Sequence, residues 1–160
     1  MDRAICIGDL VTEEMRILLG NRCFGSAGLV IGSSSKPKVK IANTTPYCIN
    51  GQMYSKATAE IVHTDLTVQA DLTTKWYLLS LDKDGNGLIT QGPAVLTADV
   101  TSVTNELALP KIAATQCAIG AFKIVTAGTT FTPATDDHDK ASLTTTYYNL
   151  SCVPTAGVPA

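Results

Sequence analysis

The chain has 160 residues, of which 45% are hydrophobic and only 16% are charged, and its formal net charge is −2 at pH 7. That length suits about one domain with a sizeable core, and the slightly acidic balance argues against direct binding to the phosphates of nucleic acids. The low fraction of charged residues is typical of β-rich structural proteins rather than of ordinary enzymes.

The first residues, MDRAICIGDLV, do not resemble an export signal, because Asp2 comes early and the apolar run is too short. No stretch approaches the roughly 18 to 20 apolar residues of a membrane-spanning helix. We therefore expect synthesis in the cytoplasm, without export and without a membrane partner.

Five cysteines are spread along the chain, and no two of them form a CxxC pair. Their odd number and wide spacing favour reduced thiols that serve as small apolar residues. A disulfide between two of them remains open. The five are Cys6, Cys23, Cys48, Cys117 and Cys152.

The first predicted element is a short helix from Thr12 to Gly20. Thr12 is a suitable N-cap, Glu13 and Glu14 suit the positive end of the helix dipole, and glycine commonly ends a helix. Fewer than about 12 residues rarely stay helical alone, so this helix should dock through an apolar face. The candidate interface residues are Met15, Ile17, Leu18 and Leu19.

The run GSSS before Lys36 and Pro37 predicts a linker. Residues 1–35 are accordingly predicted to form an N-terminal arm with a short helix and a linker. Residues 36–153 are predicted to form a β domain, and residues 154–160 a Pro- and Gly-rich tail. The basic stretch KPKVK at the start of the β domain is interpreted as an edge-strand or loop feature.

Strand patterns fill the predicted β domain. Asn50-Gly51 is a strong hairpin signal, because both residues tolerate a positive φ, and Gly120 predicts a bend or bulge within a strand. Many short strands with turn residues between them predict a mainly β fold, an antiparallel β-sandwich or barrel-like domain. The predicted strand segments include 39–43, 46–56, 57–64, 66–70, 74–81, 88–92, 117–128 and 142–153.

The segment DKDGNGLITQGP begins like an EF-hand calcium loop, with Asp82, Asp84 and Asn86 at its first, third and fifth positions. The twelfth position, however, is Pro93 instead of a bidentate glutamate, and the flanks have strand composition. We interpret the segment as the turn of a hairpin whose side chains bond local backbone amides. A weak calcium site of another kind is the alternative.

Two further segments carry residues suited to chemistry. TDDHDK places Asp136, Asp137, His138 and Asp139 in a row, which is either a divalent-metal site or, as we favour, a solvated loop. His63 and Asp65 would share one face of a strand, but no nucleophile motif accompanies them. We interpret His63 as a surface or rim histidine, and we expect neither enzymatic activity nor a bound cofactor.

Four segments carry a resemblance to a known class of protein: YCINGQMYSKATAEIV, TTKWYLLSLDKDGNGLITQG, ALPKIAATQCAIGAFKIVTAGTTFTPATDD and the closing YYNLS. Together they resemble small virion structural proteins of tailed bacteriophages, namely head decoration (cement) proteins and head- or tail-fibre proteins. The resemblance covers roughly residues 45–152 and contains no catalytic signature. It implies a homo-oligomer, normally a trimer, on the capsid surface or in a spike, with the major capsid protein as a partner.

Two functions follow as expectations. The first is a decoration protein that stabilises a phage head by non-covalent clamping of capsid subunits. The second is a fibre protein whose β domain binds a receptor or glycan, with Trp76, Tyr147 and Tyr148 as stacking residues; Trp76 would instead belong to the core if its apolar strand is buried. A calcium- or carbohydrate-dependent module or hydrolase has the least support.

Overall fold

The computed structural model describes residues 20–34, 36–100 and 107–151. These residues form a mainly β fold in which every pairing between strands is antiparallel, and their helical content is one short 3-10 turn, η1 (Thr97–Asp99). The strands are β1 (Arg22–Cys23), β2 (Val30–Ile31), β3 (Lys38–Ile41), β4 (Thr45–Ile49), β5 (Gln52–Lys56), β6 (Ala59–Val62), β7 (Thr73–Leu81), β8 (Gly87–Leu96), β9 (Cys117–Thr126) and β10 (Leu143–Asn149).

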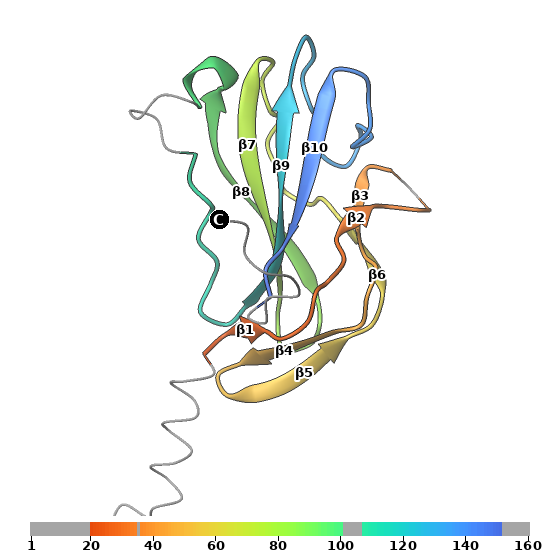
Figure 1. Cartoon of the computed structure of the whole chain (residues 1–160), viewed down its shortest axis with the longest axis vertical. Coiled ribbons are helices and arrows are strands. Elements are labelled where there is room, and N and C mark those ends of the chain that lie inside the picture. Colours follow the sequence, from red (N-terminus) through yellow and green to blue (C-terminus); the bar gives the residue numbers. More distant parts are fainter. Residues whose placement is uncertain (1–19, 35, 101–106, 152–160) are drawn as a thin grey trace, which may run out of the picture.

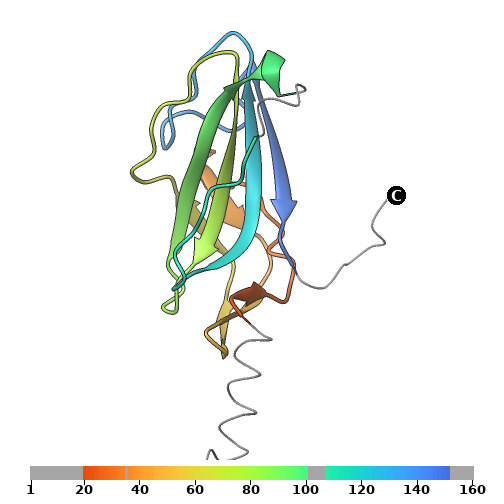
Figure 2. The same cartoon turned by 90° about the vertical axis from the view of Figure 1, so that its left-hand side faces the viewer.

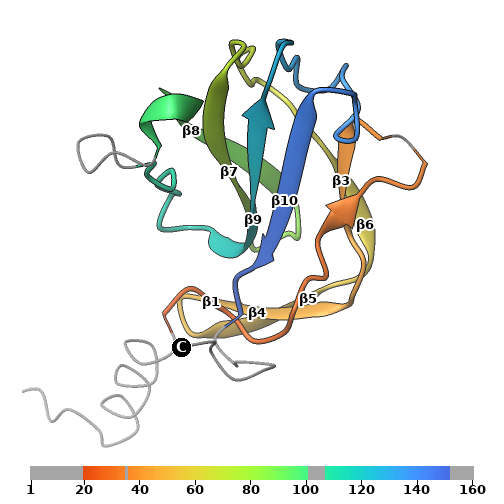
Figure 3. The same ribbon diagram turned by 45° about the horizontal axis from the view of Figure 1, so that its top comes forward.

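The strands form three sheets with the orders β10-β9-β7-β8, β2-β3-β6 and β1-β4-β5. The four-stranded sheet makes one layer, the β2-β3-β6 sheet lies opposite it, and the β1-β4-β5 sheet crosses one end (Figures 1 and 3). The arrangement is sandwich-like. The prediction of a mainly β, antiparallel fold is therefore confirmed.

One hydrophobic core lies between the layers and draws on all three sheets. Alternation along the strands supplies it: in β3, Val39 and Ile41 are fully buried while the two lysines between and before them are partly exposed. Such a period of two is what a strand with one buried face requires. The largest fully buried side chains are Tyr47, Tyr77, Phe122, Phe131, Ile41, Leu79, Leu81, Ile119 and Ile124.

The central strand β7 is covered on both faces, since only Trp76 along its length is less than fully buried. Its inner face packs on the core, and residues 107–116 descend beside the four-stranded sheet on the other side (Figure 2). Ser80 Oγ donates to Gln116 Oε1 over 3.2 Å, and an added Cβ at Gly92 would lie 2.8 Å from the carbonyl oxygen of Ala108. Residues 107–116 have no regular secondary structure, but they cover the outer side of β7 and β8 as a further layer of strands or helices would.

The bulge predicted at Gly120 is present. The register between β7 and β9 shifts from Leu79↔Gly120 to Ser80↔Ala118. A Cβ at Gly120 would lie 2.9 Å from Cγ of Leu29 and 3.0 Å from the carbonyl oxygen of Tyr148. The glycine is therefore required for close packing as well as for the irregular register.

The segment before residue 35 differs from the prediction of an arm and linker, because its described part lies inside the β domain. β1 pairs with β4, β2 pairs with β3, and Cys23 and Leu29 lie in the core. Residues 32–34 of the GSSS run lie in the turn between β2 and β3, where Ser33 and Ser34 donate backbone and hydroxyl hydrogen bonds to the carboxylate of Glu60. A distant acidic side chain thus orders a segment whose composition resembles that of a linker.

Several predictions fall outside the described residues. They include the helix from Thr12, the interface residues Met15, Ile17, Leu18 and Leu19, the tail at 154–160, and Cys6 and Cys152. The other three cysteines, Cys23, Cys48 and Cys117, are buried. Within the described ranges, no helix is long and apolar enough to cross a membrane.

Candidate functional site

The Asp82–Asn86 segment is a hairpin turn, as predicted. Oδ1 of Asp82 accepts hydrogen bonds from the backbone N–H groups of Asp84 and Asn86, over 2.9 and 2.8 Å, and Oδ2 accepts one from the Asn86 side chain over 2.9 Å. The carboxylate thus closes the turn between β7 and β8. In the part of the chain that the structure describes, no group of three or more His, Cys, Asp or Glu residues is placed to hold a metal ion.

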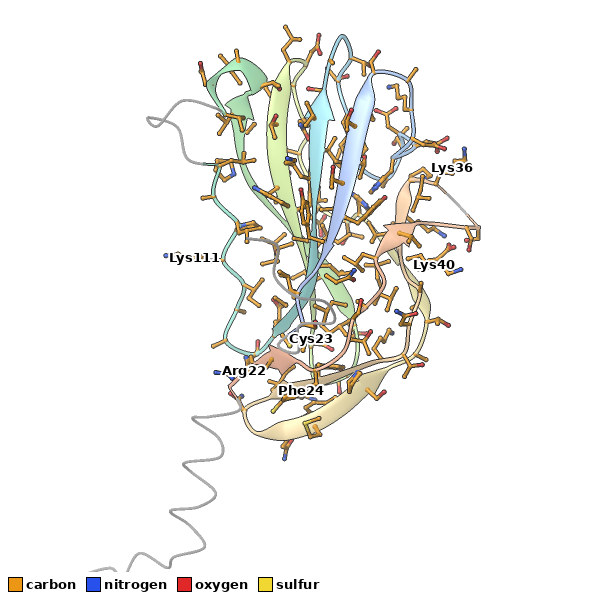
Figure 4. The ribbon with its side chains drawn as sticks, in the orientation of Figure 1. Arg22, Cys23, Phe24, Lys36, Lys40 and Lys111 are labelled. Atoms are coloured by element: carbon orange, nitrogen blue, oxygen red, sulfur yellow. The ribbon has the colours of Figure 1, made fainter. Side chains whose placement is uncertain are left out.

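The acidic run near residue 138 does not converge on one point. Asp136 pairs with Lys140 over 2.9 Å, whereas Asp139 pairs over 2.7 Å with Lys36 in the β2–β3 turn. Lys36 and Lys40 project at this outer edge of the domain (Figure 4). His138 is turned inward and is only 3% exposed. The acidic residues therefore fasten a loop by two separate ion pairs. His138, which was predicted to lie in a solvated loop, is instead a buried residue.

A pair of buried histidines joins the two layers. Nε2 of His63 lies 3.1 Å from Nε2 of His138, and Nδ1 of His138 lies 2.7 Å from the hydroxyl of Tyr147 on β10. His63 follows β6 and is also 3% exposed, so the interpretation of His63 as a surface or rim residue is wrong. With either arrangement of the ring protons, Nδ1 of His63 lacks a hydrogen-bond partner among the described residues.

The surroundings of this pair are aromatic, because the rings of Tyr77, Phe122 and Phe131 lie within 6.4 Å of the His63 ring, centroid to centroid. Burial away from water disfavours the charged imidazolium. It lowers the pKa of His63 to about 3, with a smaller contribution from the neighbouring His138, and the pKa of His138 to about 4, against a weak opposing effect of Asp139. Both imidazoles are therefore neutral in the folded protein at neutral pH.

The three predicted stacking residues do not share one surface. Trp76 on β7 and Tyr148 on β10 lie together on the outer face of the four-stranded sheet, with ring centroids 5.0 Å apart and planes tilted by 59°. Tyr147 instead points inward to His138. Trp76 is half-buried and lies outside the main core, and the Lys123 ammonium is 5.9 Å from its ring centroid. The two outer rings are therefore not coplanar.

A surface that the sequence did not indicate lies at the η1 end of the domain. Leu72 and Leu96 are each more than half exposed, and we call these two residues the aliphatic end. A backbone contact places them near one another: the N–H of Thr97, the residue after Leu96, donates to the carbonyl of Leu72 over 2.9 Å. Leu72 lies just before β7 and Leu96 is the last residue of β8, so strand alternation gives little indication that they are exposed.

Leu72 is unusual in conformation as well as in exposure. Its φ is +54°, in the left-handed region that favours glycine or asparagine, and its side chain is 59% exposed. A leucine at this position is strained, and it also leaves apolar surface in water. Strained conformations and exposed apolar groups both concentrate where proteins bind partners.

Comparisons with models of known protein families, with curated proteins and with solved structures give no match to this chain.

Proposed function

We propose that this protein is a structural component of a phage virion, a decoration protein that binds the outer surface of the capsid and stabilises the head. The observation that carries the proposal is the aliphatic end, an exposed apolar surface built on a rigid β domain. The major capsid protein is the proposed partner, and further copies of the same chain are the proposed neighbours.

The segments that carry the phage resemblance support this proposal by where they lie. YCINGQMYSK spans the β4–β5 hairpin, with Asn50 and Gly51 at φ of 50° and 79° in its turn. KWYLLSLDKDGNGLITQG spans the β7–β8 hairpin, and IGAFKIVT lies in β9. The resemblance therefore rests on the hairpins and strands that build the domain.

The aliphatic end is suited to weak clamping. Burying the exposed part of each of its two side chains would contribute about 1 kcal/mol, or about 2 kcal/mol in all. Association costs at least as much, so one copy would bind poorly through this surface alone. Several copies joined in an oligomer, each contacting the lattice, would add their contributions through multivalency. This requirement fits the homotrimer expected from the resemblance.

The proposed clamping is tested by co-sedimentation of the full chain with capsids of the phage whose genome encodes it. A Leu72→Asn/Leu96→Lys double variant should lose most capsid binding, because it removes apolar contact and adds a charge at the interface. Met53→Lys is the matched control, since Met53 on β5 is equally exposed at 58% but lies at the opposite end of the domain. Absence of binding by the wild-type chain would refute the proposal; equal loss in both variants would refute the role of the aliphatic end.

The N-terminal interface residues Met15, Ile17, Leu18 and Leu19 remain a proposed second contact. The deletion that tests them should remove residues 1–19 only, because Cys23 and Leu29 belong to the core. Weaker capsid binding by a chain that keeps its wild-type unfolding midpoint would support the contact. Light scattering after size-exclusion chromatography measures the oligomer, for which we expect a trimer.

A fibre protein with a receptor- or glycan-binding β domain is the second candidate. It is favoured by the half-buried Trp76 and the 39% exposed Tyr148, which lie together on the outer sheet face. A Tyr148→Leu variant that abolished binding to host cells, while wild-type protein failed to bind capsids, would favour this alternative.

A further inference from the structure

A pocket of about 370 Å³ opens between two hairpin turns. One wall is the β4–β5 hairpin, which contributes Asn50, Gln52 and Tyr54, and the other is the β7–β8 turn, which contributes Lys83 and Asp84. This volume falls within the range of roughly 300 to 1,000 Å³ that is usual for small-molecule sites. The pocket lies away from both the aliphatic end and the Trp76–Tyr148 pair.

The aromatic wall of the pocket is held rigidly. The ring of Tyr54 stacks on the ring of Tyr47, with centroids 5.5 Å apart and planes inclined by 25°. Tyr47 is itself fully buried, and its hydroxyl donates to the carbonyl oxygen of Asp82 over 2.8 Å. The hydroxyl of Tyr54 donates to Oε1 of Gln52 over 2.8 Å. Tyr54 therefore needs little additional ordering to receive an apolar ligand face.

Neutral polar groups surround this ring and keep hydrogen-bonding capacity. The side chains of Asn50 and Thr115 line the pocket and make no hydrogen bond with any other described residue. Gln52 accepts from Tyr54 through its oxygen, which leaves its NH₂ group to donate. The pocket therefore offers amide and hydroxyl groups of both donor and acceptor type next to an aromatic ring.

The charges of the pocket narrow the class of ligand. The Lys83 ammonium at the pocket pairs with the Asp84 carboxylate over 3.1 Å. The Asp82 carboxylate accepts hydrogen bonds within the β7–β8 turn. Two carboxylates against one ammonium disfavour phosphates and other anions. The occupied oxygens of Asp82 disfavour a metal ion. What suits the site is a neutral ligand with hydroxyl groups around its rim and an apolar face.

We propose that this pocket is a carbohydrate-binding site, which takes a neutral sugar residue whose C–H face packs on Tyr54 and whose hydroxyls bond Asn50, Gln52 and Thr115. The proposal goes beyond capsid decoration and does not depend on it. A decoration protein with such a site would present it on the β1-β4-β5 end of the domain, opposite the aliphatic end.

The test is a titration of the full ¹⁵N-labelled chain with methyl glycosides of glucose, galactose, mannose and N-acetylglucosamine, followed by amide NMR shifts. At least one sugar should give saturable shifts that concentrate at Asn50, Gln52, Lys83 and Thr115. We expect a dissociation constant of about 1 mM, because a single small site contributes only a few kcal/mol.

Two variants remove different parts of the site. Tyr54→Leu removes the aromatic ring and should weaken binding by about 10-fold, the loss of roughly one aromatic contact. Asn50→Gly removes the carboxamide but suits the positive φ of the turn, so it should fold normally and weaken binding by about 5-fold. Tyr148→Leu, on the outer sheet face, is the control and should bind like the wild type.

Three outcomes would overturn the carbohydrate site. They are the absence of saturable shifts with all four sugars, shifts centred on Trp76 and Tyr148 instead, and unchanged affinity in Asn50→Gly. None of these outcomes bears on capsid binding, because co-sedimentation measures that function separately.

Discussion

The buried imidazole pair predicts a steep loss of stability in mildly acidic solution. The chain has two histidines in all, and both belong to this pair. Their pKa values in the folded state, about 3 for His63 and about 4 for His138, lie below the value of about 6.5 expected in the unfolded chain. As the pH falls below about 6.5, the unfolded state therefore binds protons that the folded state does not, and the free energy of unfolding decreases.

The size of the effect follows from the number of protons. Near pH 5.5 each imidazole of the unfolded chain carries about 0.9 proton, so the pair should reduce the free energy of unfolding by about 2.5 kcal/mol per pH unit. Between about pH 7 and pH 5 the loss amounts to about 4 kcal/mol, a large part of the usual stability of a domain. Carboxylates contribute little in this window, because they are ionised in both states.

The assay is urea unfolding followed by the fluorescence of Trp76 at several pH values in this range. In His63→Phe one imidazole is gone, so the slope should fall to about 1.2 kcal/mol per pH unit; phenylalanine suits the site because the neighbours of His63 are aromatic rings. Tyr147→Phe is the control, since it removes a hydrogen bond of His138 but keeps both imidazoles, and therefore lowers stability without changing the slope.

A wild-type slope near zero between about pH 7 and pH 5 would refute this reasoning. It would mean that the imidazoles bind protons equally in the folded and unfolded states, which buried imidazoles cannot do.

Gly120→Ala should lower the free energy of unfolding by about 1 to 3 kcal/mol, because its Cβ would crowd the Leu29 side chain; an unchanged urea midpoint would contradict the close packing. Leu72→Asn should leave stability unchanged or raise it by up to about 1 kcal/mol, since asparagine tolerates the positive φ, and a clear loss in the same assay would show that the leucine supports the fold. Calcium and a chelator should leave the melting temperature unchanged, because the Asp82 oxygens already close their turn; a rise with calcium would revive the calcium-loop interpretation. The hydroxyl and backbone N–H of Ser34 hold the pKa of Glu60 at about 2, so this carboxylate should lose its stabilising effect only as the pH falls from about 4.5 toward that value, and an NMR titration midpoint near the ordinary value would exclude these bonds.

The parts of the fold that could be predicted from sequence depend on local patterns. Asn50-Gly51 marked a hairpin because few other residues tolerate its backbone angles, and the β7–β8 hairpin was indicated by strand composition on both sides of Asp82 to Asn86. Gly120 marked a bulge for the same kind of reason. In each case the deciding information lies within a few residues along the chain.

The remainder depends on partners that are far away in sequence. His63 is buried because it meets His138, 75 residues further on, and no feature near His63 indicates that contact. Ser33 and Ser34 of the GSSS run are held by Glu60, which lies 27 and 26 residues further on. β1 and β2 have two residues each, too few for any periodicity to appear.

The candidate sites show the same division. Sequence reasoning selected aromatic residues by type and therefore grouped Tyr147 with Trp76 and Tyr148, although alternation along β10 sends adjacent tyrosines to opposite faces. It missed the Tyr54 pocket because the two hairpins that form it meet only in the folded chain.

The contacts between the N-terminal segment and the last part of the chain have a consequence for synthesis of the protein in the cell. The N–H of Leu29 bonds Oδ1 of Asn149 on β10 over 3.1 Å, and the carboxamide of Asn21 bonds the carbonyls of Ala114 and Gln116. β1 and β2 can pair with β4 and β3 earlier, but the bond from Leu29 to Asn149 cannot form until β10 has left the ribosome. We expect folding to be completed after translation, so that nascent chains that stop before β10 keep core residues such as Phe122 exposed and become substrates for chaperones and proteases.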